Sequence, residues 1–204
     1  NAQTSLTQAV DFTVTDVHGN THNLFNYLDA GKHVILDFFF TTCPPCISSV
    51  PILNQAFTDY GCNTAEVIFL SIDNDDSDLE VLQYENDYGG LLPSISGLDG
   101  GGNAVNSAYG IGAYPTVVLI APNRTILEQD IWPVSNITIA LPAHGLNTAS
   151  CDTGITTILE IPLAYQNINK KRIIDVLGRY WECSFSELPK GLYIINGNKI
   201  LKTE

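Results

Sequence analysis

The sequence predicts an α/β fold in which buried strands alternate with helices. The strand-like run "KHVILDFFF" (residues 32–40) leads directly into the helical pattern "PPCISSVPILNQAFTDYG" (residues 44–61). A second buried run, "EVIFLSID" (residues 66–73), is followed by Ser77 and Glu80, which are spaced as a capping box at the start of another helix. This alternation is typical of parallel strands in a central sheet that helices cover.

Two hairpins are also expected. The turn at residues 18–20 predicts a hairpin near the start of the chain. A Gly-rich loop with a short helical piece (residues 96–115) leads to "TVVLIAP" (residues 116–122) and "TILEQDIW" (residues 125–132), which predict a second hairpin. A last helix over residues 136–144 should complete the layer of helices.

The chain is expected to contain two parts. Residues 1–150 hold the α/β pattern and form the main domain. Residues 151–204 consist of short strand-like runs, such as "GLYIING", separated by Asn, Lys, Gly and Pro. This second part is therefore expected to be a small β-rich C-terminal module.

Composition and charge exclude some classes of partner. The chain has 204 residues, 45% of them hydrophobic, and its nine Lys and Arg against 22 Asp and Glu give a net charge of −13. Nucleic acids and anionic membrane surfaces would be repelled by this charge. The longest apolar run, residues 34–40, is far shorter than the roughly 20 residues that span a bilayer. We therefore expect no nucleic-acid partner and no membrane-spanning segment.

Cys43 and Cys46 form a Cys-x-x-Cys pair at the predicted start of the helix over residues 44–61. The N-terminus of a helix lowers the pKa of a thiol through its partial positive charge and its free N–H groups, and only a thiolate attacks a disulfide. Cys43 is therefore the expected attacking thiol. Cys46 lies one turn along on the same face and is expected to be the more buried, resolving thiol.

Metal binding is the first alternative for the two cysteines. A tetrahedral zinc site needs four ligands, yet no second Cys-x-x-Cys exists, and His18 and His22 flank a predicted turn. A copper or zinc carrier that uses the same thiols, or a scaffold protein with a merely structural disulfide, stays open as a different kind of function. In "DNDDSD" (residues 73–78) the spacing of a calcium loop is incomplete, so this run is interpreted as a helix cap. No resident metal or cofactor is expected.

Two motifs resemble the thioredoxin superfamily. In "DFFFTTCPPCISSVP", Asp37, Pro45 and Pro51 occupy the places of the buried acid, the second residue between the cysteines and the proline that kinks the helix. "GAYPTVVLIAP" resembles the cis-proline loop of the family, with Tyr114 before Pro115. The resemblance covers about residues 10–148 and is greatest to exported, thioredoxin-like redoxins of the AhpC/TSA type.

The resemblance implies a thioredoxin fold, with a central mixed sheet flanked by helices. It also implies a thiol–disulfide oxidoreductase that acts on protein thiols and disulfides, is re-reduced by a partner protein and is a monomer. It assigns Asp37 as the proton acceptor for Cys46. The Lys that pairs with this acid in thioredoxin is replaced by Phe69, so the pKa of the buried Asp37 should rise. The residues that the resemblance places at the substrate surface are Thr42, Pro44, Pro45, Tyr114, Pro115 and Thr116.

A peroxidase is the nearest competing chemistry on the same fold. That motif needs a Pro and a Thr ahead of a single Cys and an Arg that holds the peroxide. The stretch "FFFTTC" contains no such Pro. Thiol–disulfide exchange is therefore preferred over a peroxidase-like function.

The fold that the resemblance implies also suggests how the other three cysteines, Cys62, Cys151 and Cys183, are arranged. In that fold the helices that end before Cys62 and Cys151 run the same way on one face of the sheet, so we expect these two residues to form a structural disulfide that leaves Cys183 free. Three inert buried thiols are the alternative.

The end of the chain resembles the last strands of the C-terminal sorting domain of type IX secretion substrates. "DVLGR", "LPKGLYII" and "KILK" carry the resemblance, which covers about residues 171–202. It implies an exported protein that is periplasmic, or at the cell surface or secreted if the signal works. A plain β appendage of the main domain is the alternative.

Overall fold

The computed structural model describes residues 4–151, 173–175, 180–181, 191–195 and 198–202. The chain divides into two compact units, Asn1–Asp152 and Thr153–Glu204. The first unit contains the candidate site. The second unit is described by itself at the end of this subsection.

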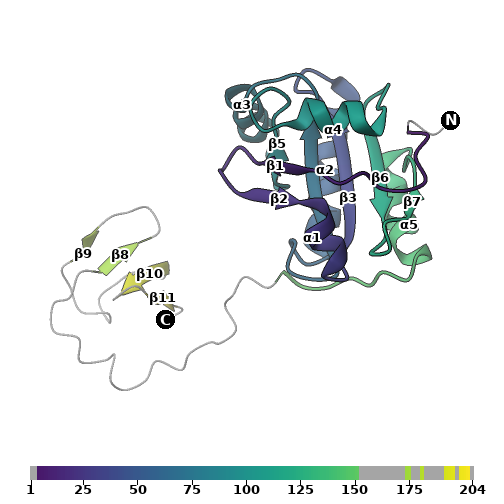
Figure 1. Ribbon diagram of the computed structural model, residues 1–204. Helices are drawn as coiled ribbons and strands as arrows, with labels where there is room; N and C mark the ends of the chain where they lie inside the picture. Colours follow the sequence, from purple (N-terminus) through teal and green to yellow (C-terminus); the bar gives the residue numbers. More distant parts are fainter. Residues whose placement is uncertain (1–3, 152–172, 176–179, 182–190, 196–197, 203–204) are drawn as a thin grey trace. The chain divides into compact units, whose positions relative to one another are not determined.

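A five-stranded mixed sheet forms the centre of the first unit, with the strand order β5-β4-β3-β6-β7 (Figure 1). Strand β3 pairs in parallel with β4, which in turn pairs in parallel with β5. On its other side β3 pairs antiparallel with β6, and β6 pairs antiparallel with β7. The predicted mixed sheet is confirmed, and its strands are β3 (His33–Phe39), β4 (Val67–Asp73), β5 (Ser94–Ile95), β6 (Thr116–Ile120) and β7 (Ile126–Glu128).

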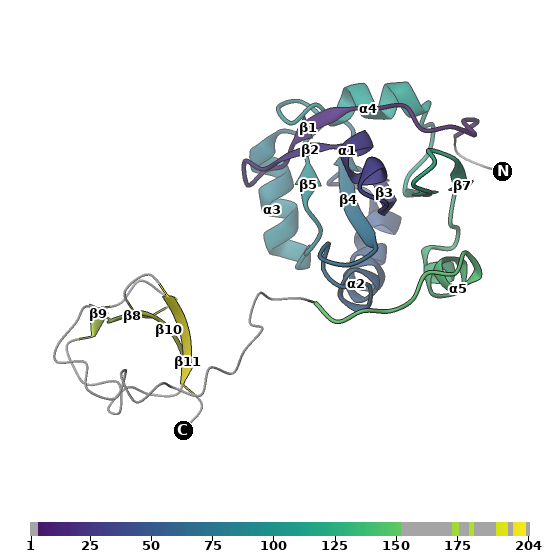
Figure 2. The same cartoon turned by 60° about the horizontal axis from the view of Figure 1, so that its bottom comes forward.

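Helices cover both faces of this sheet. Helices α1 (Leu24–Asp29) and α4 (Gly102–Tyr109) lie on one side, together with the hairpin of β1 (Thr13–Thr15) and β2 (Thr21–Asn23) (Figure 2). The other side carries α2 (Pro44–Asp59), the 3₁₀ turn η1 (Val134–Asn136) and α5 (Ile137–Ala143), whereas α3 (Asp78–Tyr88) lies beside the short edge strand β5.

The side chains of β3 alternate between two apolar clusters, as a strand buried on both faces requires. Leu36 and Phe38 pack in the cluster beneath α1 and α4, whereas Ile35 packs in the cluster beneath α2 and α5. Phe39, on the same face as Ile35, joins a third cluster with the two cysteines. Because Asp37 lies between Ile35 and Phe39 in this alternation, its carboxyl group is on the α2 face of the sheet.

Two short elements were not expected from the sequence. Helix α1 is only six residues long, too short for a 3.6-residue pattern to stand out, and it begins where Asn23 Oδ1 accepts the Asn26 N–H at 2.8 Å. Strand β5 has only two residues. In contrast, the start of α3 follows the sequence, because Glu80 Oε2 accepts the Ser77 N–H at 2.8 Å as a capping box requires.

The described residues of the second unit form a separate four-stranded antiparallel sheet with the order β11-β10-β8-β9. Its strands are β8 (Ile173–Asp175), β9 (Tyr180–Trp181), β10 (Gly191–Ile195) and β11 (Asn198–Lys202). Across the described parts of both units, no helix is both long and apolar enough to cross a bilayer.

Candidate active site

Cys43 and Cys46 form a disulfide at the point where β3 passes into α2. Cys43 is the N-cap residue of the helix, with an extended backbone, and Cys46 lies in the first turn. Pro44 and Pro45 fill the first two helical positions, where a missing N–H removes no helical hydrogen bond. The two Cα atoms are 5.2 Å apart, a spacing that a disulfide accommodates.

At the N-terminus of α2 one backbone N–H, that of Cys46, points at the sulfur of Cys43, because Pro44 and Pro45 have no N–H. The Cys46 N–H donates to Cys43 Sγ over 3.2 Å, so a sulfur atom occupies the position where a Ser or Asp oxygen commonly caps a helix. No acidic residue lies in the first turn of α2. When the disulfide is reduced, this geometry stabilises a Cys43 thiolate through the helix dipole and a charge-assisted hydrogen bond.

Both cysteines are buried, with exposed fractions of 1% for Cys43 and 3% for Cys46. The expectation that Cys46 is the more buried of the pair is therefore wrong. The reason is that apolar side chains from three elements surround both sulfurs: Phe39 from β3, Val50 from α2 and Tyr84 from α3 belong to the same cluster. The surface beside the disulfide is provided by its neighbours, since Thr42, Pro44 and Pro45 are all exposed.

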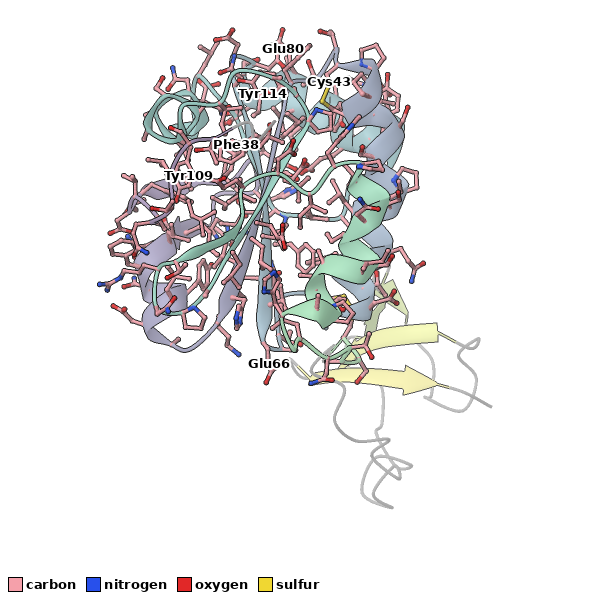
Figure 3. All side chains as sticks on the ribbon, turned by 90° about the vertical axis from the view of Figure 1, so that its right-hand side faces the viewer. Phe38, Cys43, Glu66, Glu80, Tyr109 and Tyr114 are labelled. Atoms are coloured by element: carbon pink, nitrogen blue, oxygen red, sulfur yellow. A yellow bond between two sulfur atoms is a disulfide. The ribbon has the colours of Figure 1, made fainter. Side chains whose placement is uncertain are left out.

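The loop before β6 lies at the same end of the unit as Cys43, and Figure 3 shows Tyr114 beside it. The Tyr114–Pro115 peptide bond is cis. The Tyr114 ring packs edge-on against Phe40, with 5.3 Å between the ring centroids, and its hydroxyl donates to Asn106 Oδ1 at 3.0 Å. Of the three residues that the resemblance placed here, Tyr114 is half-buried, whereas Pro115 and Thr116 are buried.

Asp37 is a buried carboxyl group beneath α2, with 6% of its surface exposed. Its Oδ2 accepts the Ser71 hydroxyl at 3.1 Å, and its Oδ1 has no hydrogen-bond partner within the described part of the chain. Burial raises the pKa of Asp37 to about 7, and the Ser71 hydrogen bond opposes this only in part. A carboxyl group with such a pKa can accept or release a proton near neutral pH.

The neighbour of Asp37 on β4 differs from the sequence-based assignment. The strand register places Ser71 beside Asp37, whereas Phe69 pairs with Ile35 and packs edge-on against Phe57. The assignment of Phe69 to the position facing Asp37 is therefore wrong by two residues. Because side chains two apart in a strand share a face, the sequence pattern alone does not separate the two positions.

No Lys or Arg of residues 4–151 pairs with Asp37. This segment contains Lys32 and Arg124 as its only Lys and Arg. Lys32 Nζ donates to the carbonyl of Ala65, and Arg124 pairs with Asp29 at 2.8 Å. The carboxyl group therefore lacks a cation from this segment that would lower its pKa.

Asp73, at the end of β4, is a second buried carboxyl group, which the sequence analysis treated only as part of a helix cap. Its side chain is 0% exposed, and its Oδ2 accepts the N–H groups of Asp76 at 2.7 Å and of Gly97 at 2.9 Å. Burial raises the pKa of Asp73 to about 7. Asp76 in turn accepts the Thr41 N–H at 2.7 Å, so this acidic turn holds the segment that precedes Cys43. In the sequence, the position of Asp73 at the end of an apolar run was the signal that could have identified it.

The two histidines considered as zinc ligands have side-chain partners from different elements. His18 Nε2 lies 2.9 Å from Glu85, and the buried His22 lies between Asp16 and Tyr27. Within the described residues, no group of three or more His, Cys, Asp and Glu side chains could hold a metal ion.

A second disulfide, Cys62–Cys151, lies just beyond the other end of α2. Ala149 brings the two segments together, because its N–H donates to the carbonyl of Asp59 at 2.8 Å and it forms a parallel bridge with Tyr60. The prediction that Cys183 is free concerns a residue outside the described parts of the chain.

The fold and the Cys43–Cys46 disulfide together define the class of enzyme to which this chain belongs. Thioredoxin-fold thiol–disulfide oxidoreductases carry a Cys-x-x-Cys pair at the N-terminus of a helix that covers a mixed sheet, and this chain is an enzyme of that class. The AhpC/TSA family matches residues 6–129, and the chain belongs to this family.

Individual relatives agree with this assignment. The thiol-disulfide oxidoreductase ResA of Bacillus thuringiensis is 33% identical over 124 residues, which cover 61% of this chain and 68% of the relative. ResA of Geobacillus thermodenitrificans is 32% identical over 118 residues, covering 58% of this chain and 64% of the relative.

Solved structures show the same fold. The thioredoxin domain of a thiol-disulfide oxidoreductase from Bacteroides vulgatus matches with a TM-score of 0.58 at 19% identity, over 71% of this chain and 98% of that chain. A thiol:disulfide interchange protein from Bacteroides sp. matches with a TM-score of 0.55 at 19% identity, over 70% and 91%.

Proposed function

We propose that this protein exchanges disulfides with protein substrates through its Cys-Pro-Pro-Cys motif, with Cys43 as the attacking thiol. The observation that carries the proposal is the position of Cys43 at the N-cap of α2, where its sulfur accepts the Cys46 N–H. A thiolate at this position is stabilised without any nearby cation. Cys46 has no equivalent capping position, so it is assigned the resolving role.

The reaction proceeds in two displacements. The Cys43 thiolate attacks one sulfur of a substrate disulfide, forms a mixed disulfide and displaces the first substrate thiolate, which takes up a proton. Asp37 then accepts the proton of Cys46, and the Cys46 sulfur attacks Cys43 Sγ. This second step forms the Cys43–Cys46 disulfide and releases the second substrate thiolate, which is also protonated. A reducing partner protein returns two electrons to the pair, and one proton restores the Cys46 thiol beside the Cys43 thiolate.

The proposed substrate surface surrounds the buried sulfurs. Its exposed members are Thr42, Pro44 and Pro45, and the half-buried Tyr114 lies beside Cys43. Pro115 and Thr116 are buried, so their role would be to shape this surface rather than to present a large contact area. We assign all six residues to substrate recognition.

Insulin reduction with dithiothreitol as electron donor tests this function. We expect Cys43→Ser to abolish turnover, because no thiolate remains at the helix N-terminus, and Cys46→Ser to trap mixed disulfides on Cys43. A Cys43→Ser variant that loses stability while the wild-type protein shows no turnover would instead support a structural disulfide in a scaffold protein. Stoichiometric copper or zinc in the purified protein, without insulin reduction, would support the metal carrier.

The peroxidase alternative finds no support in the described part of the chain. The single Arg of residues 4–151, Arg124, pairs with Asp29 and lies over the ring of Phe25 at 4.2 Å, so it is not placed to hold a peroxide at Cys43. Hydrogen peroxide consumption by the reduced protein, measured beside insulin reduction, distinguishes the two reactions.

We further propose that the protein is exported and acts as a monomer. The Cys62–Cys151 disulfide supports an oxidising compartment, because structural disulfides persist there and are rare in a reducing cytosol. The resemblance of residues 171–202 to a type IX sorting signal supports transport to the cell surface. Deletion of residues 153–204 should then retain the protein in the periplasm of its native host, and size-exclusion chromatography with light scattering should give the mass of one chain.

A further inference from the structure

A small cavity of about 20 Å³ lies between α2, α3 and the sheet. Its volume is sufficient for one water molecule. Asp37 and Ser71 line its buried part, whereas Asn54, Gly90 and Leu91 line it near the surface. Since Leu91 is 56% exposed and Asp37 only 6%, the cavity extends from the buried carboxyl group toward solvent.

The side chain of Asn54 fixes the outer wall of this cavity. From α2, its Nδ2 donates to the carbonyl of Gly89 at 2.8 Å, and its Oδ1 accepts the Leu91 N–H at 3.0 Å. Gly89 ends α3 in the left-handed conformation, at φ 74°, so the chain turns sharply at this point. Both polar ends of one side chain therefore hold the α3–β5 turn against α2.

Asp37 needs a connection to solvent if it is to accept a proton in every turnover. Its Oδ2 is occupied by Ser71, and its Oδ1 has no hydrogen-bond partner among the described residues. No Lys or Arg of residues 4–151 pairs with it, as described above. A water molecule in the cavity is the group that can receive the proton from Asp37 and pass it outward.

We propose that this cavity is the path by which Asp37 exchanges its proton with solvent, and that Asn54 is a positioning residue that keeps the path narrow by holding the turn at residues 89–91. The inference rests on the proposed role of Asp37 as proton acceptor for Cys46. In each turnover the proton moves from the Cys46 thiol to Asp37 and then to water in the cavity. No electrons move in this second transfer.

Other titratable groups face the same region and are part of the argument. Tyr84 of α3 lines the cavity, and burial, followed by the nearby charge of Asp37, raises its pKa above the usual value, so it remains neutral. Asp73 of β4 lies near Tyr84 and also has a pKa of about 7. A pH profile alone would therefore not assign a titration to Asp37, and a signal from the carboxyl group itself is needed.

The experiment is a ¹³C NMR titration of the Asp37 carboxyl carbon in the oxidised, full-length protein, with assignment by Asp37→Asn. We expect Asn54→Ala to lower the pKa of Asp37 by about one unit or more, because release of the turn lets water hydrate the carboxylate. Val50→Ile, which adds a methyl group to the cavity wall, should raise it. Asn86→Ala is the matched control, because Asn86 on α3 is exposed and bonds only to the carbonyl of Leu82 within its own helix.

An unchanged Asp37 titration in Asn54→Ala, or an equal shift in Asn86→Ala, would overturn the proposed path. The insulin assay on the wild-type protein separates this result from a failure of the proposed function. If the wild-type protein turns over and the pKa of Asp37 is unchanged in Asn54→Ala, the proposed path is ruled out and the proposed exchange reaction stands. If the pKa of Asp37 shifts in Asn54→Ala but the wild-type protein shows no turnover, the proposed exchange reaction is ruled out and the path between Asp37 and solvent is supported.

Discussion

The two disulfides of the first unit lie at opposite ends of α2 and differ in their electrostatic surroundings, in exposure and in the length of the loop that they close. Cys43–Cys46 is at the N-terminus, where the Cys46 N–H donates to Cys43 Sγ, and Cys62–Cys151 follows the C-terminus. There, Cys151 Sγ lies 3.5 Å from the carbonyl oxygen of Thr58, in the last turn of α2. The positive end of the helix stabilises a thiolate, whereas the negative end opposes one.

By exposure alone, Cys62–Cys151 would be expected to be the more reactive of the two disulfides. Cys43 and Cys46 are buried, whereas Cys62 and Cys151 are partly exposed. We therefore attribute the proposed exchange at Cys43–Cys46 to local electrostatics rather than to exposure. The sequence separations of 3 and 89 residues indicate a corresponding difference in how much each bond stabilises the fold.

The largest expected effect is on stability at the second disulfide. A loop of 89 residues corresponds to about 4 to 5 kcal/mol on the chain-entropy relation, whereas the short loop between Cys43 and Cys46 corresponds to about 2 kcal/mol. Cys62→Ser/Cys151→Ser should therefore lower the free energy of unfolding by more than Cys43→Ser/Cys46→Ser. Only the second double variant should lose turnover. Urea denaturation and insulin reduction measure the two effects, and an equal loss of stability in both variants would contradict this assignment.

The next effect concerns Asp37, the buried acid on the α2 face of the sheet. Its pKa of about 7 in the folded protein exceeds the ordinary value of 3.8, so the folded state binds more protons than the unfolded state between about pH 4 and 7. Its contribution to stability is therefore complete below pH 4 and is lost as the pH rises through this window. Three pKa units correspond to about 4 kcal/mol as an upper value.

Asp37→Asn should remove this pH dependence. Relative to the wild type, the variant should become more stable as the pH rises from 4 to 8, while its rate of insulin reduction falls. Denaturation curves of both proteins at several pH values measure the difference, in which the similar contribution of Asp73 cancels. A difference that does not change with pH would contradict the raised pKa of Asp37.

The smallest expected effect distinguishes the two ends of the unit by surface charge. Asp75 is exposed and lies near Tyr114 beside the candidate site, since the pKa of Tyr114 is raised first by burial and then by the charge of Asp75. Glu66 is exposed at the opposite end (Figure 3). With a Lys-rich peptide disulfide at low salt, Asp75→Asn should slow reduction about twofold, the effect of one exposed charge, and the difference should vanish in about 0.5 M salt. Glu66→Gln is the matched control, and an equal effect there would exclude a local role for Asp75.

The parts of this account that the sequence predicted are those with a strong local pattern. The long strands, the helix after Cys43 and the capping box at Ser77 all follow from hydrophobic periodicity and turn chemistry. Asp37 interrupts a run of apolar residues, but its role as proton acceptor was inferred from the resemblance of residues 37–51 to the thioredoxin signature. Its place as a charged residue inside a buried strand supported that inference.

The remaining features depend on contacts between segments far apart in the chain. The pairing of Asp37 with Ser71 depends on the register of β3 and β4. A register shifted by two residues would leave the same face apolar, so the hydrophobic pattern does not distinguish the two. The burial of Cys43 needs α3 in place, and the Asn54 contact with the turn at residues 89–91 joins two helices. Short elements such as α1 carry too few residues to show a period.

The central claim is that one disulfide exchanges while the other does not, and a redox titration tests it most directly. The full-length protein is equilibrated in glutathione buffers of graded potential, alkylated, and analysed by mass spectrometry for each cysteine. We expect Cys43 and Cys46 to become alkylated together with a two-electron slope of about 30 mV per tenfold change, while Cys62 and Cys151 stay bonded. Opening of Cys62–Cys151 at the same or a less reducing potential, or a Cys43–Cys46 bond that resists the whole series, would contradict the account.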